Sequence, residues 1–228
     1  MTSGITCRDL SVSFTLGNKK KRTVLDKITA VFQAGKMSII TGPVGTGKTT
    51  LLNTLAGLTR PTSGEVMVND QAISRWTGPH RDRWRRQAGI VFQHDHLVHD
   101  LTVLENVMLP LIPLGHTLSA CRSQSMDALE RVGLLNHAGN PVTSLSGGER
   151  KKTAMARAIV NQPDFIFADE PTSHLDAESS RQMMDLLYHH ACRNAVVIVA
   201  AHGLTLDTLP GPPLCYRLEH GVLNLLIS

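Results

Sequence analysis

One stretch of the sequence constrains the fold more than any other. Residues 42–49 read Gly-Pro-Val-Gly-Thr-Gly-Lys-Thr, which matches the pattern G-x-x-x-x-G-K-[ST]. The stretch follows a short apolar run at residues 37–41 and precedes a helical pattern at residues 50–56. A glycine-rich turn between a strand and a helix aims backbone N–H groups and the positive end of the helix at one point. The sequence therefore predicts a phosphate-binding loop rather than an ordinary glycine turn.

Each residue type in this loop suits the binding of a nucleotide. The glycines let the backbone approach phosphate oxygens, Lys48 reaches the β and γ phosphates, and the Thr49 hydroxyl is a ligand for Mg²⁺. The residues predicted to bind nucleotide here are Gly42, Pro43, Val44, Gly45, Thr46, Gly47, Lys48, Thr49 and Thr50.

Short apolar runs alternate with helical patterns along the chain, which is typical of a largely parallel sheet with helices on its faces. Residues 37–41, 165–168 and 195–201 have the character of fully buried parallel strands. Because ligands of such sheets bind outside the carboxyl ends of the strands, the phosphate loop, the pair Asp169 and Glu170, and His202 should meet in one crevice.

The remaining segments predict additions to this sheet. Before and after the loop, three further strands, separated by a charge run and a turn, suggest a small antiparallel layer, and later parts of the chain suggest a helical insertion and a final hairpin. The three strands are residues 5–14, 28–32 and 64–69, with the charge run at 19–22 and the turn at 60–64 between them. The helical pattern covers residues 101–136 and is broken at Pro110 and Pro113. The hairpin covers residues 214–228, with its turn at His220 and Gly221.

Length and composition exclude several classes of protein. With 228 residues, 42% of them hydrophobic, the chain fits one folding unit over residues 1–228 with an insertion at about 95–150. A net charge of +4 is too small and too dispersed to indicate a nucleic-acid partner. No apolar stretch approaches the roughly 18–20 residues of a membrane-spanning helix, and the first residues do not read as a signal peptide. The four cysteines form no C-x-x-C pair, and His94, His96 and His99 lack the spacing of a metal site.

Two further motifs carry chemistry. Asp169 and Glu170 end an apolar run, so that Asp169 suits a metal-side carboxylate and Glu170 can polarise an attacking water, although such a pair can also mark a mere turn or cap. Ser146 and Glu149 have the spacing of a capping box at a helix start. A capping box does not explain the paired glycines 147 and 148, which indicate a second anion-binding helix end.

In this order, the phosphate loop, the peptide Leu-Ser-Gly-Gly-Glu at 145–149, the acidic pair, residues 173–176 and His202 resemble the motifs of ATP-binding-cassette ATPases. The resemblance covers essentially the whole chain, and the 145–149 peptide is specific to that family. It implies an α/β fold with a P-loop NTPase (RecA-like) parallel-sheet core, an antiparallel β subdomain and an inserted α-helical subdomain. It also implies ATP and Mg²⁺ as ligands, and a head-to-tail homodimer in which Ser146 and Gly148 of one subunit contact the γ-phosphate held by Lys48 of the other.

The resemblance assigns further roles by position. Phe14 looks like the aromatic residue that stacks on adenine, although ordinary packing within a strand would also explain it. His202 resembles the histidine that contacts the γ-phosphate, although a solvent-exposed histidine after a strand is the plainer interpretation. The full set comprises Glu170, His202 and Gln93 as catalytic residues, Thr49, Gln93 and Asp169 as metal ligands, and Phe14, the loop, Ser146, Gly147, Gly148 and Asp176 as nucleotide-binding residues. The sequence departs from the usual pattern at Arg150, Lys151 and Lys152, at Ala201 and Gly203, and at His174.

Residues 91–107, followed by Leu-Pro-Leu at 109–111, are similar to the ATPases of lipoprotein-releasing, macrolide-exporting and cell-division complexes. This predicts the ATP-hydrolysing motor of an exporter or mechanotransmission complex, peripheral on the cytoplasmic face of the inner membrane and in contact with the membrane only through a separate integral permease. One alternative is an importer ATPase, although the tail leaves no room for the regulatory domain that importers often carry. The other is a soluble ATPase acting on nucleic acid through Arg81, Arg83, Arg85 and Arg86, which salt-dependent binding to DNA would reveal.

Overall fold

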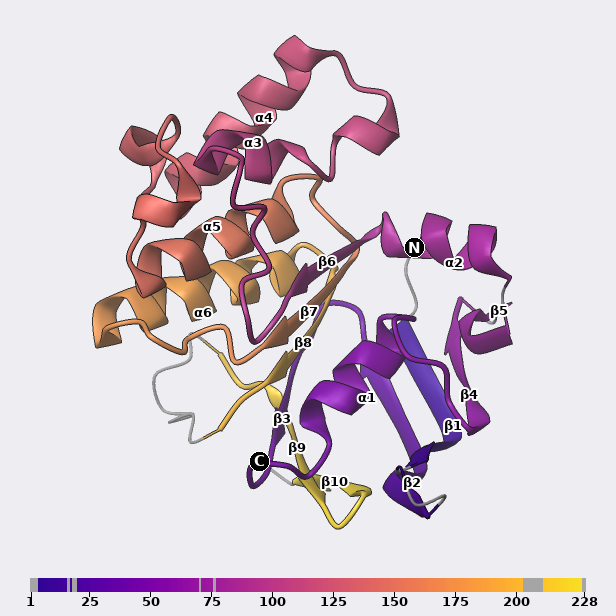
Figure 1. The fold of residues 1–228 in the computed structure, drawn as a ribbon. Helices are drawn as coiled ribbons and strands as arrows, with labels where there is room; N and C mark the ends of the chain where they lie inside the picture. Colours follow the sequence, from indigo (N-terminus) through magenta and orange to yellow (C-terminus); the bar gives the residue numbers. More distant parts are fainter. Residues whose placement is uncertain are drawn as a thin grey trace.

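The computed structural model describes residues 4–15, 17, 20–69, 71–75, 77–202 and 211–226. These residues form two β-sheets with helices packed between and around them (Figure 1). Lys19 of the predicted charge run, Gly203 beside His202, and Ser228 at the end of the predicted hairpin lie outside the described residues.

The larger sheet has six strands in the order β10-β9-β3-β8-β7-β6. Neighbouring strands pair in parallel, except for the hairpin of β9 and β10. Adjacent residues of a strand point into different cores, so that Ile39 packs on one face of the sheet and Ile40 on the other. The strands are β3 (Met37–Thr41), β6 (Ala88–Val91), β7 (Phe165–Asp169), β8 (Val196–Ala200), β9 (Leu214–Glu219) and β10 (Val222–Leu226). The three predicted parallel strands, β3, β7 and β8, are confirmed to within a residue at each end, and β9 and β10 confirm the predicted hairpin.

The smaller sheet is antiparallel, in the order β2-β1-β4-β5. Its strands are β1 (Gly4–Thr15), β2 (Lys21–Gln33), β4 (Ser63–Val68) and β5 (Gln71–Ala72), which confirms the predicted antiparallel layer. The expectation that the charge run separates the first two strands is wrong for Lys21 and Arg22, which pair with Thr15 and Phe14 inside the sheet. Both basic side chains are exposed, and an antiparallel sheet with one face in water accommodates such residues.

Helices fill the space around the sheets (Figure 1). Helix α1 (Lys48–Leu55) lies between them, because its leucines share a core with residues of both β1 and β7. On the opposite face of the large sheet lie α5 (Gly147–Ile159) and α6 (Ala177–Cys192), and α3 (Val103–Met108) and α4 (Leu118–Arg131) pack on α5. The short elements are α2 (Gly78–Arg85) and the 3₁₀ turns η1 (Ile73–Arg75), η2 (Ile112–Leu114), η3 (Leu135–His137) and η4 (Val142–Ser144).

The predicted helical stretch at 101–136 contains α3, η2 and α4, and the break occurs at Pro110 and Pro113 as expected. Over the described ranges, no helix has both the length and the apolar character that crossing a membrane requires.

A buried histidine on α6 makes stability depend on pH. Burial, with Arg131, His189 and Arg193 nearby, lowers the pKa of His190 from 6.5 to about 4, and its Nε2 has no hydrogen-bond partner. Between those two values the unfolded chain binds a proton that the folded chain does not bind, so stability decreases as the pH falls from 6.5 toward 4.

We expect His190→Met to reduce this loss of stability between pH 7 and pH 5 by on the order of 1 kcal/mol. Urea denaturation at both pH values measures the effect. His189→Met, which changes an exposed neighbour on the same helix, is the matched control and should change the pH dependence far less, because burial is the largest cause of the His190 shift and His189 a smaller one. An unchanged slope in His190→Met would contradict the assignment.

Candidate functional site

The carboxyl ends of four neighbouring strands carry the predicted catalytic residues. Strand β3 runs into Gly42, β6 is followed by Gln93, β7 ends at Asp169, and β8 is followed by His202. These strands are adjacent in the order β3-β8-β7-β6 and parallel, so their carboxyl ends lie along one edge of the sheet (Figure 1). The structure therefore brings together at one edge residues that lie up to 160 positions apart.

The phosphate loop has a backbone that only glycine adopts readily. Gly42, Gly45 and Gly47 have φ angles of 148°, 79° and 104°. A Cβ atom on Gly42 would lie 2.3 Å from the carbonyl oxygen of Leu218, so this glycine is also required by the close approach of β9. Gly47 is the N-cap of α1, and no side chain caps that helix start. The N–H groups of the first turn are therefore free of a side-chain cap and suited to an anion.

Lys48 lies across this loop. Its side chain is buried, and Nζ donates hydrogen bonds to the carbonyl oxygens of Gly42 at 2.8 Å and Pro43 at 2.9 Å. Thr46 Oγ1 also donates to the Pro43 carbonyl, at 2.9 Å. The ammonium group is thus held at the start of α1, where it adds a full positive charge to that of the helix end.

Thr49 and Asp169 meet at the metal side of the site. Thr49 Oγ1 donates to Asp169 Oδ2 at 2.6 Å, which joins α1 to the end of β7. Burial raises the pKa of Asp169, the hydrogen bond from Thr49 opposes this shift, and the carboxylate of Glu170 adds to it. A buried carboxylate with a raised pKa beside a hydroxyl oxygen favours a cation that restores its charge.

Glu170 follows with an unusual backbone. Its φ of 47° lies in the left-handed region, its N–H donates to the Ala200 carbonyl at 2.9 Å, and its carbonyl accepts from Ser173 N at 3.1 Å and Oγ at 2.9 Å. The main chain is therefore fixed on both sides of Glu170, while the side chain is only half-buried. Positive φ at a glutamate is strained, and such strain persists where the surrounding structure enforces it.

The second predicted anion site is the start of α5. Ser146 is the N-cap, its Oγ accepts from Glu149 N at 3.3 Å, and Glu149 Oε2 accepts from Ser146 N at 2.7 Å, so the capping box is confirmed. Ser146 Oγ also donates to Glu149 Oε2 at 2.7 Å, and this hydrogen bond, together with that from Ser146 N, lowers the pKa of Glu149. A Cβ atom on Gly148 would lie 3.3 Å from Leu175 Cδ2, so this glycine also serves the packing of the 173–176 segment.

Asp176 has a local role that the sequence reasoning did not assign. It is the N-cap of α6, and its side chain accepts from Ser179 N and Ser179 Oγ, both at 2.8 Å. Those hydrogen bonds lower its pKa. The preceding His174 has a φ of 65° and lies against Gly147 and Gly148 at the start of α5, and both His174 and Asp176 are exposed.

Two predicted contact residues lie on the surface. Phe14 on β1 is 46% exposed, so the reading of Phe14 as strand core is wrong and its ring is free to stack on a ligand. His202 is exposed directly after β8, and the neighbouring Ala201 N–H donates to the Ile40 carbonyl at 3.0 Å. That bond places His202 next to the phosphate-loop strand.

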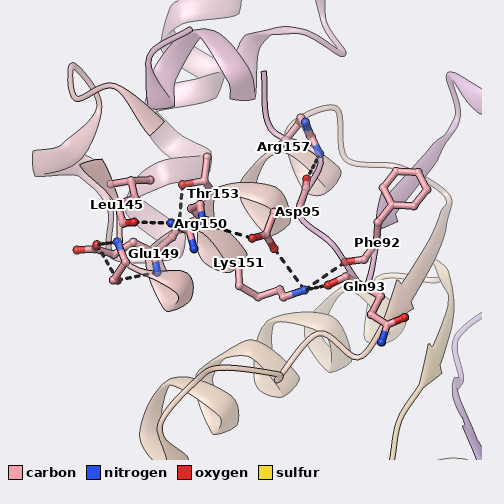
Figure 2. A network of polar contacts seen from close by, with 10 residues as sticks. Phe92, Gln93, Asp95, Leu145, Glu149, Arg150, Lys151, Thr153 and Arg157 are labelled. Atoms are coloured by element: carbon pink, nitrogen blue, oxygen red, sulfur yellow. Dashed lines mark hydrogen bonds and ion pairs between the residues drawn. The ribbon is translucent and has the colours of Figure 1, made fainter. Parts of the chain in front are cut away.

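A polar network was missed by the sequence reasoning. Lys151 of α5 contacts the backbone of Phe92 and Gln93 and the carboxylate of Asp95, whereas the side chain of Gln93 points away from this network (Figure 2). Helical spacing could have found it, because Lys151 lies four residues before Met155 on the buried face of α5. A lysine in an apolar stripe indicates a buried charge with a partner.

Comparison with known proteins agrees with this geometry. Residues 25–173 match the family model described as ABC transporter. The lipoprotein-releasing system ATP-binding protein LolD of Idiomarina loihiensis is 38% identical over 202 residues, which cover 88% of each chain, and that of Saccharophagus degradans is 36% identical over 98% of this chain and 97% of its own.

Solved structures agree as well. The dimeric structure of MJ0796, a bacterial ABC transporter cassette, superimposes with a TM-score of 0.90 at 28% identity and covers 98% of this chain and 99% of its own. A dimeric post-hydrolysis state of MJ0796 bound to ADP and phosphate matches with a TM-score of 0.89 at 27% identity over the same shares. With the phosphate loop, the acidic pair and the capped α5 in place, these matches show that the chain belongs to the ABC transporter ATP-binding family and is an ATPase.

Proposed function

We propose that this chain is the ATP-hydrolysing subunit of a lipoprotein-releasing exporter, and that it works as a homodimer on a separate integral membrane permease at the cytoplasmic face of the inner membrane. The observation that carries this proposal is its 36–40% identity to lipoprotein-releasing ATP-binding proteins, which extends over nearly the full length of both chains. No observation of comparable weight favours an importer or a nucleic-acid ATPase.

In the proposed reaction ATP is held by the phosphate loop, and the Phe14 ring stacks on its adenine. The Thr49 hydroxyl, the Asp169 carboxylate and the Gln93 amide supply oxygen atoms of the kind that Mg²⁺ prefers, and the first two already lie 2.6 Å apart. Mg²⁺ would neutralise charge on the β and γ phosphates. Glu170 accepts the proton of the attacking water, and His202 contacts the γ-phosphate.

The second half of each site comes from the partner copy. The start of α5, with Ser146, Gly147 and Gly148, contacts the γ-phosphate that Lys48 of the other copy holds, and Asp176 lies where the two sites join. The dimeric MJ0796 structures support this assembly. Closure of the dimer on ATP, and reopening after phosphate release, then moves the permease.

A groove near Gln93 is suited to the permease. It has a volume of about 370 Å³, combines apolar residues with basic ones, and shares Phe92 and His96 with the segment around Gln93. Arg86 and Arg157 give it positive charge, whereas Arg85 is paired with Asp82, and this charge favours a cytoplasmic permease segment with acidic side chains. Its lining includes Arg85, Arg86, Phe92, Pro110, Pro113 and Arg157.

The experiment is reconstitution with the lipoprotein-releasing permease in liposomes, with ATPase rate and release of a lipoprotein as readouts. We expect the permease to raise the ATPase rate by roughly threefold or more, because it binds the closed and open states unequally. Arg86→Glu, a charge reversal at the exposed rim of the groove, should remove this stimulation and leave the basal rate unchanged.

Lys48→Ala in the same liposomes is the control without ATP hydrolysis and should release nothing. The proposal fails if wild-type protein neither binds this permease nor is stimulated by it, or if it is stimulated instead by the permease of an importer. The groove assignment alone fails if Arg86→Glu is stimulated like the wild type.

A further inference from the structure

Helix α5 carries a fully buried cation. Lys151 is 1% exposed, and the helix places it on the same face as Met155 and Ala158, which are buried in the core. A lysine side chain is almost never buried to this extent unless its charge is paired. Its partners therefore indicate what the charge does.

Among the described residues, its hydrogen-bond and ion-pair partners all belong to the segment that follows β6 (Figure 2). Lys151 Nζ donates to the carbonyl oxygens of Phe92 at 3.2 Å and Gln93 at 2.8 Å. It also lies 3.3 Å from Asp95 Oδ1. That contact is an ion pair without hydrogen-bond geometry, since Oδ1 has no hydrogen-bond partner. The ammonium thus faces two carbonyl dipoles and one carboxylate.

Two arginines of the same helix reinforce this attachment. Arg157 Nη2 donates to the Asp95 carbonyl at 2.7 Å, and Nη1 donates to the His96 carbonyl at 2.8 Å. Arg150 Nη1 donates to the Leu145 carbonyl at 2.7 Å, and its Nε lies 3.8 Å from Asp95 Oδ2. Carbonyls at Phe92, Gln93, Asp95 and His96 are therefore all held by side chains of α5.

The attachment joins two parts of the site with different partners. Gln93 follows β6 of this copy's own sheet, whereas the start of α5 at Ser146 is proposed to contact the ATP of the other copy. Lys151 lies less than two helical turns after Ser146. A shift of Gln93 is thus transmitted to the α5 start through a short, buried and charged contact.

We propose that Lys151, paired with Asp95, is a positioning residue that makes the Gln93 segment and the start of α5 move as one body, and so couples the two ATP sites of the dimer. The proposal rests on the head-to-tail dimer of the proposed function. Lysine suits this role because its ammonium has three N–H donors and a charge, whereas glutamine has two donors and no charge, and methionine has neither.

The test compares Lys151→Met and Lys151→Gln with the wild type by hydrogen exchange and by ATP-dependent kinetics. In Lys151→Met we expect amides of residues 92–97 to exchange about tenfold faster, because the segment opens locally without its anchor. The Hill coefficient for ATP should fall to 1 from a wild-type value above 1, since the link between the sites is broken. Lys151→Gln, which keeps donors for the carbonyls, should lie between the two.

Lys152→Met is the matched control, because it removes the same charge one position along the same helix, and within the described part of the chain Lys152 makes no hydrogen bond or ion pair to the Gln93 segment. It should keep wild-type exchange and cooperativity. Asp95→Asn tests the partner. Combined with Lys151→Met, it should add less loss of cooperativity than it causes alone, because both changes break one interaction.

The outcomes separate this proposal from the one on which it rests. If the wild type is cooperative and folded Lys151 variants keep wild-type exchange and cooperativity, the coupling role is overturned. A uniform rise in exchange over the whole chain would also overturn it, because that indicates general destabilisation. If the wild type shows no cooperativity and no ATP-dependent dimer, the head-to-tail dimer fails, and exchange at 92–97 still decides whether Lys151 holds the segment.

Discussion

Glu170→Gln is expected to bind ATP like the wild type but to hydrolyse it about 10²–10³-fold more slowly, because a general base typically contributes a factor of this size. An amide of the same shape cannot take the proton of the attacking water. The substitution should stay local, since the backbone N–H and carbonyl of Glu170 are fixed by Ala200 and Ser173 and do not depend on the side chain. Steady-state phosphate release and nucleotide titration measure the two parts of the expectation.

The same variant should collect as an ATP-bound dimer on gel filtration, because closure no longer leads to hydrolysis and reopening. Glu178→Gln is the matched control, since Glu178 is an exposed glutamate of α6 whose carboxylate is paired with Arg181. It should hydrolyse ATP at the wild-type rate and show no such dimer. A Glu170→Gln protein that turns over ATP at the wild-type rate would show that another group is the base.

The parts of the site that were predictable from sequence are those fixed by local chain geometry. The phosphate loop is specified by glycines whose φ angles no other residue adopts cheaply, so its pattern survives in the sequence. The convergence of Gly42, Asp169 and His202 follows from a rule about parallel strands and needs no knowledge of distances. The capping box at Ser146 and Glu149 is likewise readable from spacing alone.

The parts that were missed depend on tertiary contacts. Lys151 and Asp95 are far apart in sequence, and although helical spacing places Lys151 on the buried face of α5, its pairing with Asp95 appears only when α5 packs against the end of β6. The inclusion of Lys21 and Arg22 in β2 was missed for a related reason: a charge run reads as a loop, but an exposed strand tolerates it when the partner strand continues alongside. In each case a long-range partner overrode the local signal.

Asp176 and Ser146 show how one residue can both cap a helix and serve a proposed ATP site. Both cap a helix within their own chain, with side-chain hydrogen bonds that lower a carboxyl pKa in each motif. The cap fixes the direction of the helix start, and the N–H groups that it leaves free remain available to an anion. A structural explanation for Ser146 therefore does not compete with a role at the partner's ATP.

The head-to-tail site makes a second large prediction, that two inactive variants restore one another. Lys48→Ala removes the cation of the phosphate loop, and Gly147→Asp puts a negative charge where the start of α5 should meet the γ-phosphate. Each alone should lose at least about 99% of the ATPase rate, because each damages both sites of its homodimer, and lost phosphate electrostatics of this kind cost factors of 10² or more. Gly147→Asp should still fold, since a Cβ there meets His174 Cβ only at 3.7 Å, and an acidic residue suits the first turn of a helix.

When the two variants are mixed, the heterodimer has one site carrying both changes and one site carrying neither. The intact site pairs Lys48 of the Gly147→Asp chain with the unaltered α5 start of the Lys48→Ala chain. The mixture should therefore recover at least about a tenth of the wild-type ATPase rate, as expected when one intact site can still complete the reaction.

Gly147→Ala, which adds a methyl group without charge, is the control for the added volume and should be far less impaired than Gly147→Asp. If the mixture stays as inactive as its parts while both variants fold and bind each other, then either the α5 start does not serve the partner's ATP or hydrolysis needs two intact sites. Titration separates these cases, because only the second leaves one tightly bound ATP per heterodimer.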